Sequence, residues 1–492
     1  MDKELAKPGF LAMICSVELL ERFAYYGLTS LLIIFLTSNL GFSDTKAYAT
    51  SSLFVAIGFA VPIVGGILAD KALGLRYLIN IGAILTLLGY GFISTFCTSE
   101  KFFTFGLALI AVGTGIFKGN LTILLGACYF PKEASKQNRG FTLFYVCINI
   151  GALMSAIMCG YITKNWGVRY GFVTASLGML FSFFIFSKYE SLLQNVGKIS
   201  VNSSKSIPII KAQAAIFLTL AILIILTTYA LHYSIEASRM LGWSAMILCL
   251  YYAFIASKAN SEERPKLLVL LLIIPFLTVF YSLQSQLYFS INLFTVRNLE
   301  TVIFGHVIPS TAFQSIAPSA TILTGLFLSR ILRKNVEKEN HTSGFIRFGI
   351  GLMGPFFCFL ILYFGCCGAI NGKVSCLYLL SLCFIGGAES LVGPFAYHQA
   401  TILAPARMKG YAMSIVLVSI AFGNLSTALI SKFMSIKTLE YLDCEQSLVI
   451  YKKGFFSLVI LQATVCVCFF VTYFLLKKRI DSVYKSNKCN NE

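Results

Sequence analysis

The sequence predicts an all-α integral membrane protein, built from two six-helix bundles with a two-helix hairpin inserted between them. Of its 492 residues, 57% are hydrophobic and 12% are charged, and the mean hydropathy is +0.79. Soluble domains carry roughly a quarter of their residues as charged ones. The apolar residues gather in segments of about 20, the length at which a helix spans a bilayer. These segments fall into groups of six, two and six along the chain.

Each predicted span is an apolar run bounded by charged or turn residues, because a backbone in lipid must satisfy its hydrogen bonds within a helix. The first group comprises residues 9–37, 48–69, 77–97, 102–128, 141–163 and 169–187. The hairpin comprises 209–231 and 241–257. The last group comprises 266–294, 308–332, 344–368, 374–403, 410–431 and 454–476. The total is fourteen spans. We expect the first to be retained, because it is too long for the core of a signal peptide.

Two polar stretches set the predicted domain boundaries. One, rich in Ser, Asn and Lys, covers about 189–208, and the other runs from Lys258 to Arg264. We therefore expect an N-terminal bundle in residues 1–190, a linker with the hairpin in 191–263, and a C-terminal bundle with a short tail in 264–492. The hairpin has few polar groups within its spans, so we expect a peripheral scaffold there.

The net charge of +18 is carried by short loops between apolar segments. It is not interleaved with aromatic residues on a soluble face, which argues against a nucleic-acid partner. More Lys and Arg lie in the loops on the side of the two termini than in the opposite loops. By the positive-inside rule, we expect both termini in the cytoplasm, in a bacterial inner membrane.

No cofactor is expected from the sequence. The 15 cysteines are scattered through apolar segments, without partners at metal-ligand spacing. No segment reads G-x-x-x-x-G-K-[ST], so the chain has no phosphate-binding loop of an ATPase. Any energy that the protein uses must come from another source.

Three ionisable residues lie within the first predicted span: Glu18, Glu21 and Arg22. A charge in the middle of a bilayer costs about 2.5–3.5 kcal/mol on insertion scales, so such residues are usually paired and tied to a substrate or ion path. At about 100° per residue, Glu18, Arg22 and Tyr25 share one face of the helix and Glu21 lies about 60° away. The span therefore carries a polar stripe with its own counterions.

Two further charges lie deep in apolar spans. Lys118 is more than ten residues from either end of 102–128, and Glu389 is the carboxylate of 374–403. With Arg22, they predict a cavity that is cationic on one wall and anionic on the other. The electric field of such a cavity suits a zwitterion such as a short peptide, whose carboxylate and ammonium are separated by the length of the peptide.

Several motifs support this interpretation. Glu18–Gly27 reads E-x-x-E-R-F-x-Y-Y-G, and further signatures lie at Gly65–Gly74, Gly113–Lys118, Phe144–Gly151 and Gly387–Glu389. Together they resemble the proton-dependent oligopeptide transporter (POT) family of the major facilitator superfamily, especially its bacterial di- and tripeptide permeases. The likeness covers nearly the whole chain.

The resemblance implies the major facilitator fold and proton-coupled import of di- and tripeptides by alternating access. It implies that Arg22 and Lys118 bind the peptide carboxylate and that Glu389 binds the amino terminus. Tyr25, Tyr26, Asn149 and Gln286 match further substrate-binding positions. Proton coupling would involve Glu18, Glu21, Arg22 and Lys118, because a buried carboxylate takes up a proton when its cation is drawn away. Which carboxylate carries the proton stays open.

The loop from Asp70 to Arg76 resembles the superfamily's cytoplasmic gate loop. An ion-pair latch that breaks for inward opening and an ordinary solvated turn are equally compatible with this short charged segment.

Four pocket positions depart from the family pattern. Phe59 stands where a tyrosine is expected, Ala317 replaces an asparagine, Ser285 replaces an acid, and Val416 stands where a tryptophan is common. Each change removes a polar or bulky group, and the loss of one buried hydrogen-bond partner costs about 1–3 kcal/mol. We expect zwitterion binding to persist, with the exact substrate and side-chain preference left open.

Three alternatives remain. The cargo could be another small zwitterion, an amino acid or an anion, although Glu389 would repel a simple anion. The protein could be a membrane peptide sensor that does not transport, although the short tail offers no signalling domain. An enzyme is the least favoured, since the chain lacks a nucleophile elbow, a metal cluster and a cofactor fingerprint. We expect a monomer whose partners are peptide, protons and lipid.

Overall fold

The computed structural model describes residues 7–69, 74–130, 134–198, 209–260, 263–334, 341–403, 409–436 and 443–489. Within these residues, 14 helical segments are long and apolar enough to cross a membrane. Each of them overlaps one of the predicted apolar segments. The prediction of an all-α protein with fourteen spans is confirmed.

The described chain divides into two compact units. Unit 1 comprises Met1–Phe42, Ala49–Ala237 and Ile308–Ser315, and unit 2 comprises Ser43–Tyr48, Ser238–Val307 and Ile316–Glu492. The helices α2 (Asp44–Leu68) and α8 (Ser234–Lys258) therefore contribute residues to both units. The predicted boundaries after residues 190 and 263 stay predictions.

Unit 1 holds the first helices of the chain and an aromatic core in which Phe35, Phe103 and Phe172 lie against one another. Its elements, with most of α2, are α1 (Phe10–Ser38), α3 (Leu75–Thr95), α4 (Glu100–Ala127), α5 (Ala134–Trp166), α6 (Val168–Tyr189), η3 (Glu190–Leu193), α7 (Ile209–His232) and η5 (Ser310–Ser315). The hairpin helix α7 adds Ile216 and Leu220 to an apolar cluster of this unit. One arm of the predicted hairpin is thus part of the core of unit 1.

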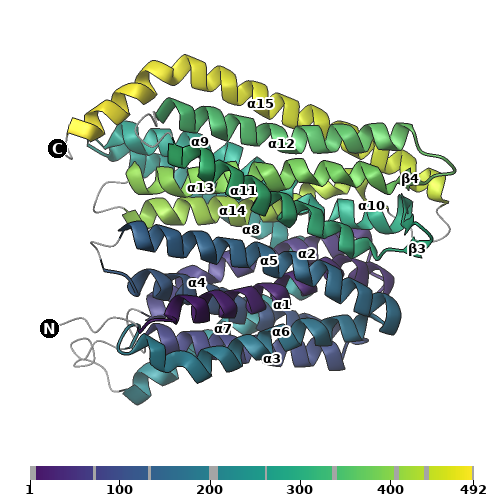
Figure 1. Ribbon diagram of the computed structural model, residues 1–492, viewed down its shortest axis with the longest axis horizontal. Coiled ribbons are helices and arrows are strands. Elements are labelled where there is room, and N and C mark those ends of the chain that lie inside the picture. Colours follow the sequence, from purple (N-terminus) through teal and green to yellow (C-terminus); the bar gives the residue numbers. More distant parts are fainter. Residues whose placement is uncertain are drawn as a thin grey trace. The chain divides into compact units, whose positions relative to one another are not determined.

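Helices α1 and α5 run side by side in unit 1 (Figure 1). A Cβ atom added at Gly151 would clash with the backbone oxygen of Leu19 and lie 3.1 Å from the Cβ of Arg22. A Cβ added at Gly27 would lie 2.8 Å from the Sγ of Cys159. The two glycines let the helices approach closely, and both contacts advance in the same direction along the chain, so α1 and α5 are parallel.

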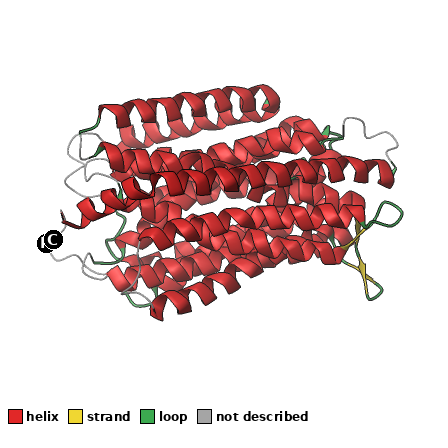
Figure 2. Ribbon diagram, turned by 90° about the horizontal axis from the view of Figure 1, so that it is seen from above, coloured by secondary structure: helices red, strands yellow, loops and turns green. Residues whose placement is uncertain are grey.

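Unit 2 contains the remaining helices and two short two-stranded sheets at one end (Figure 2). Its elements, with most of α8, are α9 (Arg264–Gln284), η4 (Ser285–Tyr288), α10 (Ser290–Asn298), β1 (Leu299–Glu300), β2 (Val302–Ile303), β3 (His306–Val307), α11 (Ile316–Lys334), α12 (His341–Cys367), β4 (Val374–Ser375), η7 (Cys376–Ser381), α13 (Leu382–Ile402), α14 (Lys409–Ser431), η9 (Lys432–Met434) and α15 (Cys444–Cys489). Strand β1 pairs with β4 in parallel, and β2 pairs with β3 antiparallel. The span predicted at 266–294 is divided by η4 into α9 and α10.

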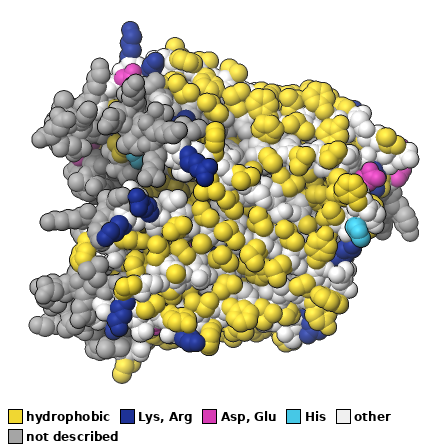
Figure 3. Space-filling model, in the orientation of Figure 1, with side chains coloured by type: hydrophobic (Ala, Val, Ile, Leu, Met, Phe, Trp, Pro, Cys, Tyr) yellow, Lys and Arg dark blue, Asp and Glu magenta, His cyan; other side chains and the backbone are white. Residues whose placement is uncertain are grey.

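The surface of the helices is largely apolar. Hydrophobic side chains cover the middle of the visible face, and Lys and Arg lie mainly toward the helix ends (Figure 3). Leu475 is 78% exposed and Ile225 is 65% exposed. Apolar side chains exposed along helices of this length are typical of a lipid-facing surface.

Candidate functional site

The charged residues of α1 form a compact buried cluster in unit 1. Glu18, Glu21 and Arg22 are each at most 2% exposed. The Nε atom of Arg22 donates to Oε2 of Glu21 at 2.5 Å and lies 3.3 Å from Oε1 of Glu18. Glu18 and Arg22 are one helical turn apart, so the helix itself stacks them on one face. One guanidinium is thus shared by two carboxylates.

Several acceptor atoms in this cluster are unsatisfied. Both oxygens of Glu18 and Oε1 of Glu21 have no hydrogen-bond partner in the described part of the chain. Buried carboxylates are stable when they are paired and fully hydrogen-bonded. The unused acceptors give the cluster capacity to take up a proton or another donor.

Lys118 of α4 adds a second cation. It interacts electrostatically with Glu18, and its Nζ lies 4.6 Å from the ring centroid of Phe59. The structure therefore brings together the four residues for which proton coupling is predicted: Glu18, Glu21, Arg22 and Lys118. Two cations face two carboxylates, so the cluster is electrically balanced when all four are charged.

Aromatic side chains surround this cluster. The guanidinium of Arg22 lies 4.9 Å from the ring centroid of Tyr25, which also stacks on Phe54. Tyr26 is half-buried and packs edge-on against Tyr25 at 5.4 Å. A cation over an aromatic face is stabilised by the quadrupole of the ring. The predicted substrate-binding tyrosines thus lie beside the cationic wall.

Asn149 of α5 is 6% exposed. Its side-chain amide donates to the carbonyl oxygen of Tyr145 at 3.0 Å, one turn earlier in the same helix. Its role in substrate binding stays a prediction.

In unit 2, Glu389 is half-buried on α13 and interacts electrostatically with Tyr397 of the same helix. Close by, a Cβ added at Gly386 would clash with the backbone of Ala317. Ala317 thus lies where α11 and α13 are in contact. The positions of Ala317 and Glu389 at a substrate pocket stay predictions.

The residues predicted around the divided span are fully engaged within unit 2. Gln286 is 0% exposed, and its Oε1 accepts hydrogen bonds from Ser290 and Ser431 while its Nε2 donates to the carbonyl of Thr427. Ser285 donates to Oδ1 of Asn424 at 2.6 Å. The contact of Gln286 with substrate stays a prediction. Val416 is 2% exposed.

At the predicted gate, Arg76 is buried and well bonded. It donates to the carbonyl oxygens of Val196 and Gln194, each at 2.7 Å, and pairs with Glu190 at 3.4 Å. Asp70 lies outside the described residues. The latch between Asp70 and Arg76 stays a prediction, and the contacts of Arg76 fix the segment that follows α6.

Sequence reasoning missed two polar groups. Tyr90 of α3 is fully buried, interacts electrostatically with Glu21, and has no hydrogen-bond partner for its hydroxyl among the described residues. Arg297 of α10 forms a two-bonded ion pair with Asp44 of α2, both N–O distances being 2.7 Å, within unit 2. For Tyr90, the available signal in the sequence was a tyrosine inside an apolar run. Asp44 and Arg297 lie at helix ends, where a charge normally signals solvent.

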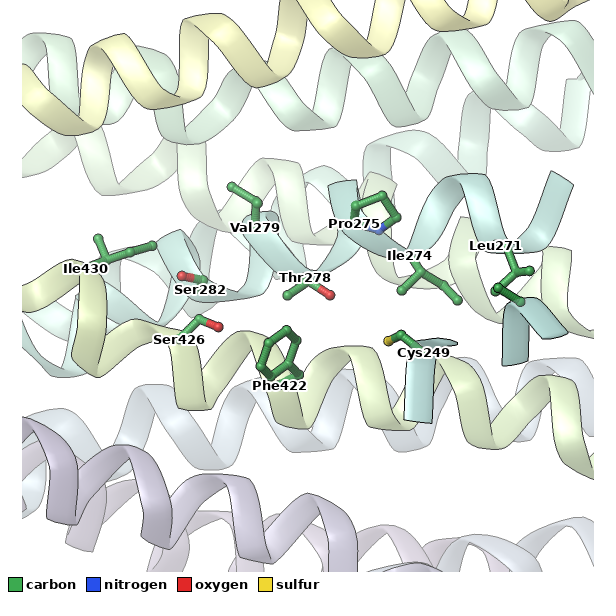
Figure 4. Close-up of a pocket in the computed structure, with 11 residues that line it drawn as sticks. Cys249, Leu271, Ile274, Pro275, Thr278, Val279, Ser282, Phe422, Ser426 and Ile430 are labelled. Carbon is green, nitrogen blue, oxygen red and sulfur yellow. The ribbon is translucent and has the colours of Figure 1, made fainter. Parts of the chain in front are cut away.

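A cavity of about 520 Å³ lies in unit 2 between α8, α9 and α14 (Figure 4). Its lining carries no charged residue. The lining comprises Cys249, Ala253, Leu271, Ile274, Pro275, Thr278, Val279, Ser282, Phe422, Ser426 and Ile430. An apolar cavity of this kind does not match the field expected for a zwitterion. Among the described residues, no group of three or more His, Cys, Asp or Glu could hold a metal ion.

In the described part of the chain, many long apolar helices and ion pairs buried within each unit are together typical of a multi-span membrane transporter. The family model described as "POT family" matches residues 75–446. The chain therefore belongs to the POT family, which confirms the resemblance of its motifs. Transporters of this family are not enzymes, need no cofactor and use the proton as their coupling ion.

Individual relatives and solved structures are consistent with this family assignment. The chain is 28% identical over 468 residues to dipeptide and tripeptide permease A of Citrobacter koseri, covering 95% of this chain and 92% of that protein. It superposes on tetrameric PepTSo2 with a TM-score of 0.82 at 22% identity, covering 96% of this chain and 99% of that one. A POT family transporter in complex with 5-aminolevulinic acid gives a TM-score of 0.78 at 21% identity, with 94% and 96% covered. The two structural likenesses show that the major facilitator fold is shared.

Proposed function

We propose that this protein is a proton-coupled symporter that imports di- and tripeptides. The named permease relatives support peptide as the cargo. The observation that carries the proposal for this chain is the charge-balanced cluster in unit 1. Glu18, Glu21 and Arg22 are buried there, Lys118 is half-buried, and three carboxylate oxygens have no hydrogen-bond partner among the described residues.

Charge balance couples the proton to the peptide. A peptide carboxylate that binds Arg22 or Lys118 adds one negative charge to a cluster that is already neutral. One proton on Glu21 or Glu18 removes that excess charge, because an unbalanced buried charge is costly. Binding of peptide and of proton therefore favour each other, and release of one favours release of the other.

Glu389 completes the proposal by binding the amino terminus of the peptide. Tyr25, Tyr26 and Asn149 would position the peptide by hydrogen bonds. We place the protein in a bacterial inner membrane as a monomer with both termini in the cytoplasm, in line with the Lys and Arg content of its loops.

The test is uptake into liposomes that contain the purified protein. With an inward proton gradient, labelled dialanine is expected to accumulate, and its uptake should stop when the gradient is collapsed with a protonophore. Free alanine should accumulate far less, because its carboxylate and ammonium are closer together than those of the dipeptides for which we propose that Arg22 and Glu389 are the two partners.

Liposomes without protein and Glu21→Gln protein are the controls. If dialanine enters without dependence on the gradient, proton coupling is wrong. If neither compound enters while the protein remains folded, the cargo is not a short peptide.

A second candidate is a symporter for another small zwitterion. It is favoured by Phe59, which lacks the expected hydroxyl beside Lys118, and by Ala317, which packs against α13 where an asparagine would offer an amide. The likeness to a POT family transporter in complex with 5-aminolevulinic acid makes an ω-amino acid a suitable probe. Competition between such amino acids and dialanine in the same liposomes distinguishes the two.

A further inference from the structure

Two thiols face each other across α1 and α5. Cys15 of α1 and Cys147 of α5 lie close enough to interact, and both are free cysteines. Neither residue has a part in the proposed transport cycle. The pair is a second chemical feature of the same helix interface.

The packing of the two helices places these residues opposite each other. One turn further on, Gly151 lies directly against Leu19, and three turns further on Gly27 lies against Cys159. All three pairs have the same separation of 132 positions in the chain, so the parallel helices stay in register from Cys15 to Gly27. A disulfide requires Cα atoms about 4.4–6.8 Å apart, a spacing that only closely packed helices provide.

The surroundings favour redox chemistry over metal binding. Cys15 is 8% exposed, and Cys147 is half-buried and thus the more accessible thiol. Glu18 interacts electrostatically with both thiols, yet within the described chain they do not form a group that could hold a metal. Two adjacent thiols of unequal exposure are the arrangement of an attacking and a resolving cysteine.

We propose that Cys15 and Cys147 form a redox-active thiol pair that a peroxide oxidises to a disulfide between α1 and α5. The thiol of Cys147 attacks one oxygen of hydrogen peroxide, giving a sulfenic acid and one water. The thiol of Cys15 then attacks the sulfur of that sulfenic acid, which releases a second water and forms the S–S bond. Two electrons pass from the thiols to the peroxide, and a dithiol reductant reverses the change by exchange.

The disulfide has a consequence for transport, and this part rests on the proposed function. Cys15 is one turn from Glu18, so drawing Cys15 toward Cys147 changes the position of the coupled carboxylate. Because the contact at Leu19 and Gly151 leaves no space, α1 cannot compensate by sliding along α5. Oxidised protein is therefore expected to lose gradient-driven uptake several-fold.

The chemical part is tested on the full-length protein in liposomes without any substrate. Hydrogen peroxide is added, remaining thiols are blocked with N-ethylmaleimide, and the digest is analysed by mass spectrometry. The expected result is a Cys15–Cys147 cross-linked peptide that dithiothreitol removes. Cys147→Ser and Cys15→Ala should each abolish it, whereas Cys97→Ser, which removes a thiol outside this helix pair, should leave it intact.

Absence of the cross-link, or oxidation spread evenly over the cysteines, would overturn the proposal. The functional arm compares dialanine uptake before oxidation, after oxidation and after dithiothreitol. Recovery with reductant in the parent protein and insensitivity of Cys147→Ser support it, whereas unchanged uptake by fully cross-linked protein overturns the link to transport. Failure of the proposed peptide function is seen separately, as absent uptake before any oxidation.

Discussion

In each unit an arginine is paired with a buried carboxylate, and the pairs of Arg22 in unit 1 and Arg297 in unit 2 are built differently. In unit 2, Arg297 binds Asp44 through two bonds of 2.7 Å, while Tyr451 accepts a further bond and the backbone N–H of Ile436 donates to Asp44. In unit 1, Arg22 is shared by Glu18 and Glu21, and three of their four oxygens have no hydrogen-bond partner in the described chain.

The comparison teaches how to tell a structural charge pair from a functional one. A fully satisfied buried network rigidifies its surroundings, whereas an incompletely satisfied one leaves buried acceptors that are stabilised when a proton or another donor reaches them. The Asp44 pair therefore belongs to the scaffold, and the Arg22 cluster is the part expected to change state. Four substitutions test this distinction.

The largest effect is expected from Glu21→Gln. The substitution removes a protonatable group but leaves Arg22 paired with Glu18, so gradient-driven dialanine uptake should fall to the level of liposomes without protein. The melting temperature in detergent should stay within a few degrees of the parent. A large loss of melting temperature would place Glu21 in the scaffold and break the comparison.

The second-largest effect is expected from Asp44→Asn, which leaves the half-buried charge of Arg297 without its fully buried partner. Breaking one side of a buried pair costs about 3–5 kcal/mol, so the melting temperature should fall clearly. The double variant Asp44→Asn/Arg297→Gln should recover part of the loss, because no unpaired charge remains. An Asp44→Asn protein with unchanged melting temperature would show that the pair contributes little.

A smaller effect is expected from Gly151→Ala. The added methyl group would press on the backbone of Leu19 and on Arg22, and overpacking of this kind costs about 1–3 kcal/mol. Both the melting temperature and uptake should decline. Gly58→Ala is the matched control, because nothing lies within 4 Å of a Cβ at that position. Equal behaviour of the two variants would contradict the tight α1–α5 contact.

The smallest effect is expected from Phe59→Leu. This change removes the aromatic face beneath Lys118 while keeping an apolar side chain, and such contacts are worth about 0.5–2 kcal/mol. The KM for dialanine should change by about twofold to thirtyfold, with little change in melting temperature. Phe59→Tyr, which keeps the ring, is the control. If Phe59→Leu alters stability more than the KM, the contact is structural.

The sequence allowed prediction of every span and of the charge cluster on α1. Spans follow from composition and length, and Glu18 and Arg22 are neighbours through helical periodicity alone. Asp44 and Arg297 are 253 positions apart and each lies near a helix end, so nothing local indicates that they are paired. The bonds of Gln286 to α14 could not be predicted, because Thr427 and Ser431 lie more than 140 positions away in the sequence. The Cys15–Cys147 pair likewise depends on a packing register that no single helix reveals.

The common register of α1 and α5 also limits where the chain can change in length. One residue inserted between Cys15 and Gly27 would turn the rest of α1 by about 100° relative to α5, displacing every later contact at once. An insertion in the loop between α1 and α2, after Phe42, leaves both α1 and α5 intact. Reporter tags and length variation should therefore be tolerated in the loops between the helices and excluded from this stretch of α1.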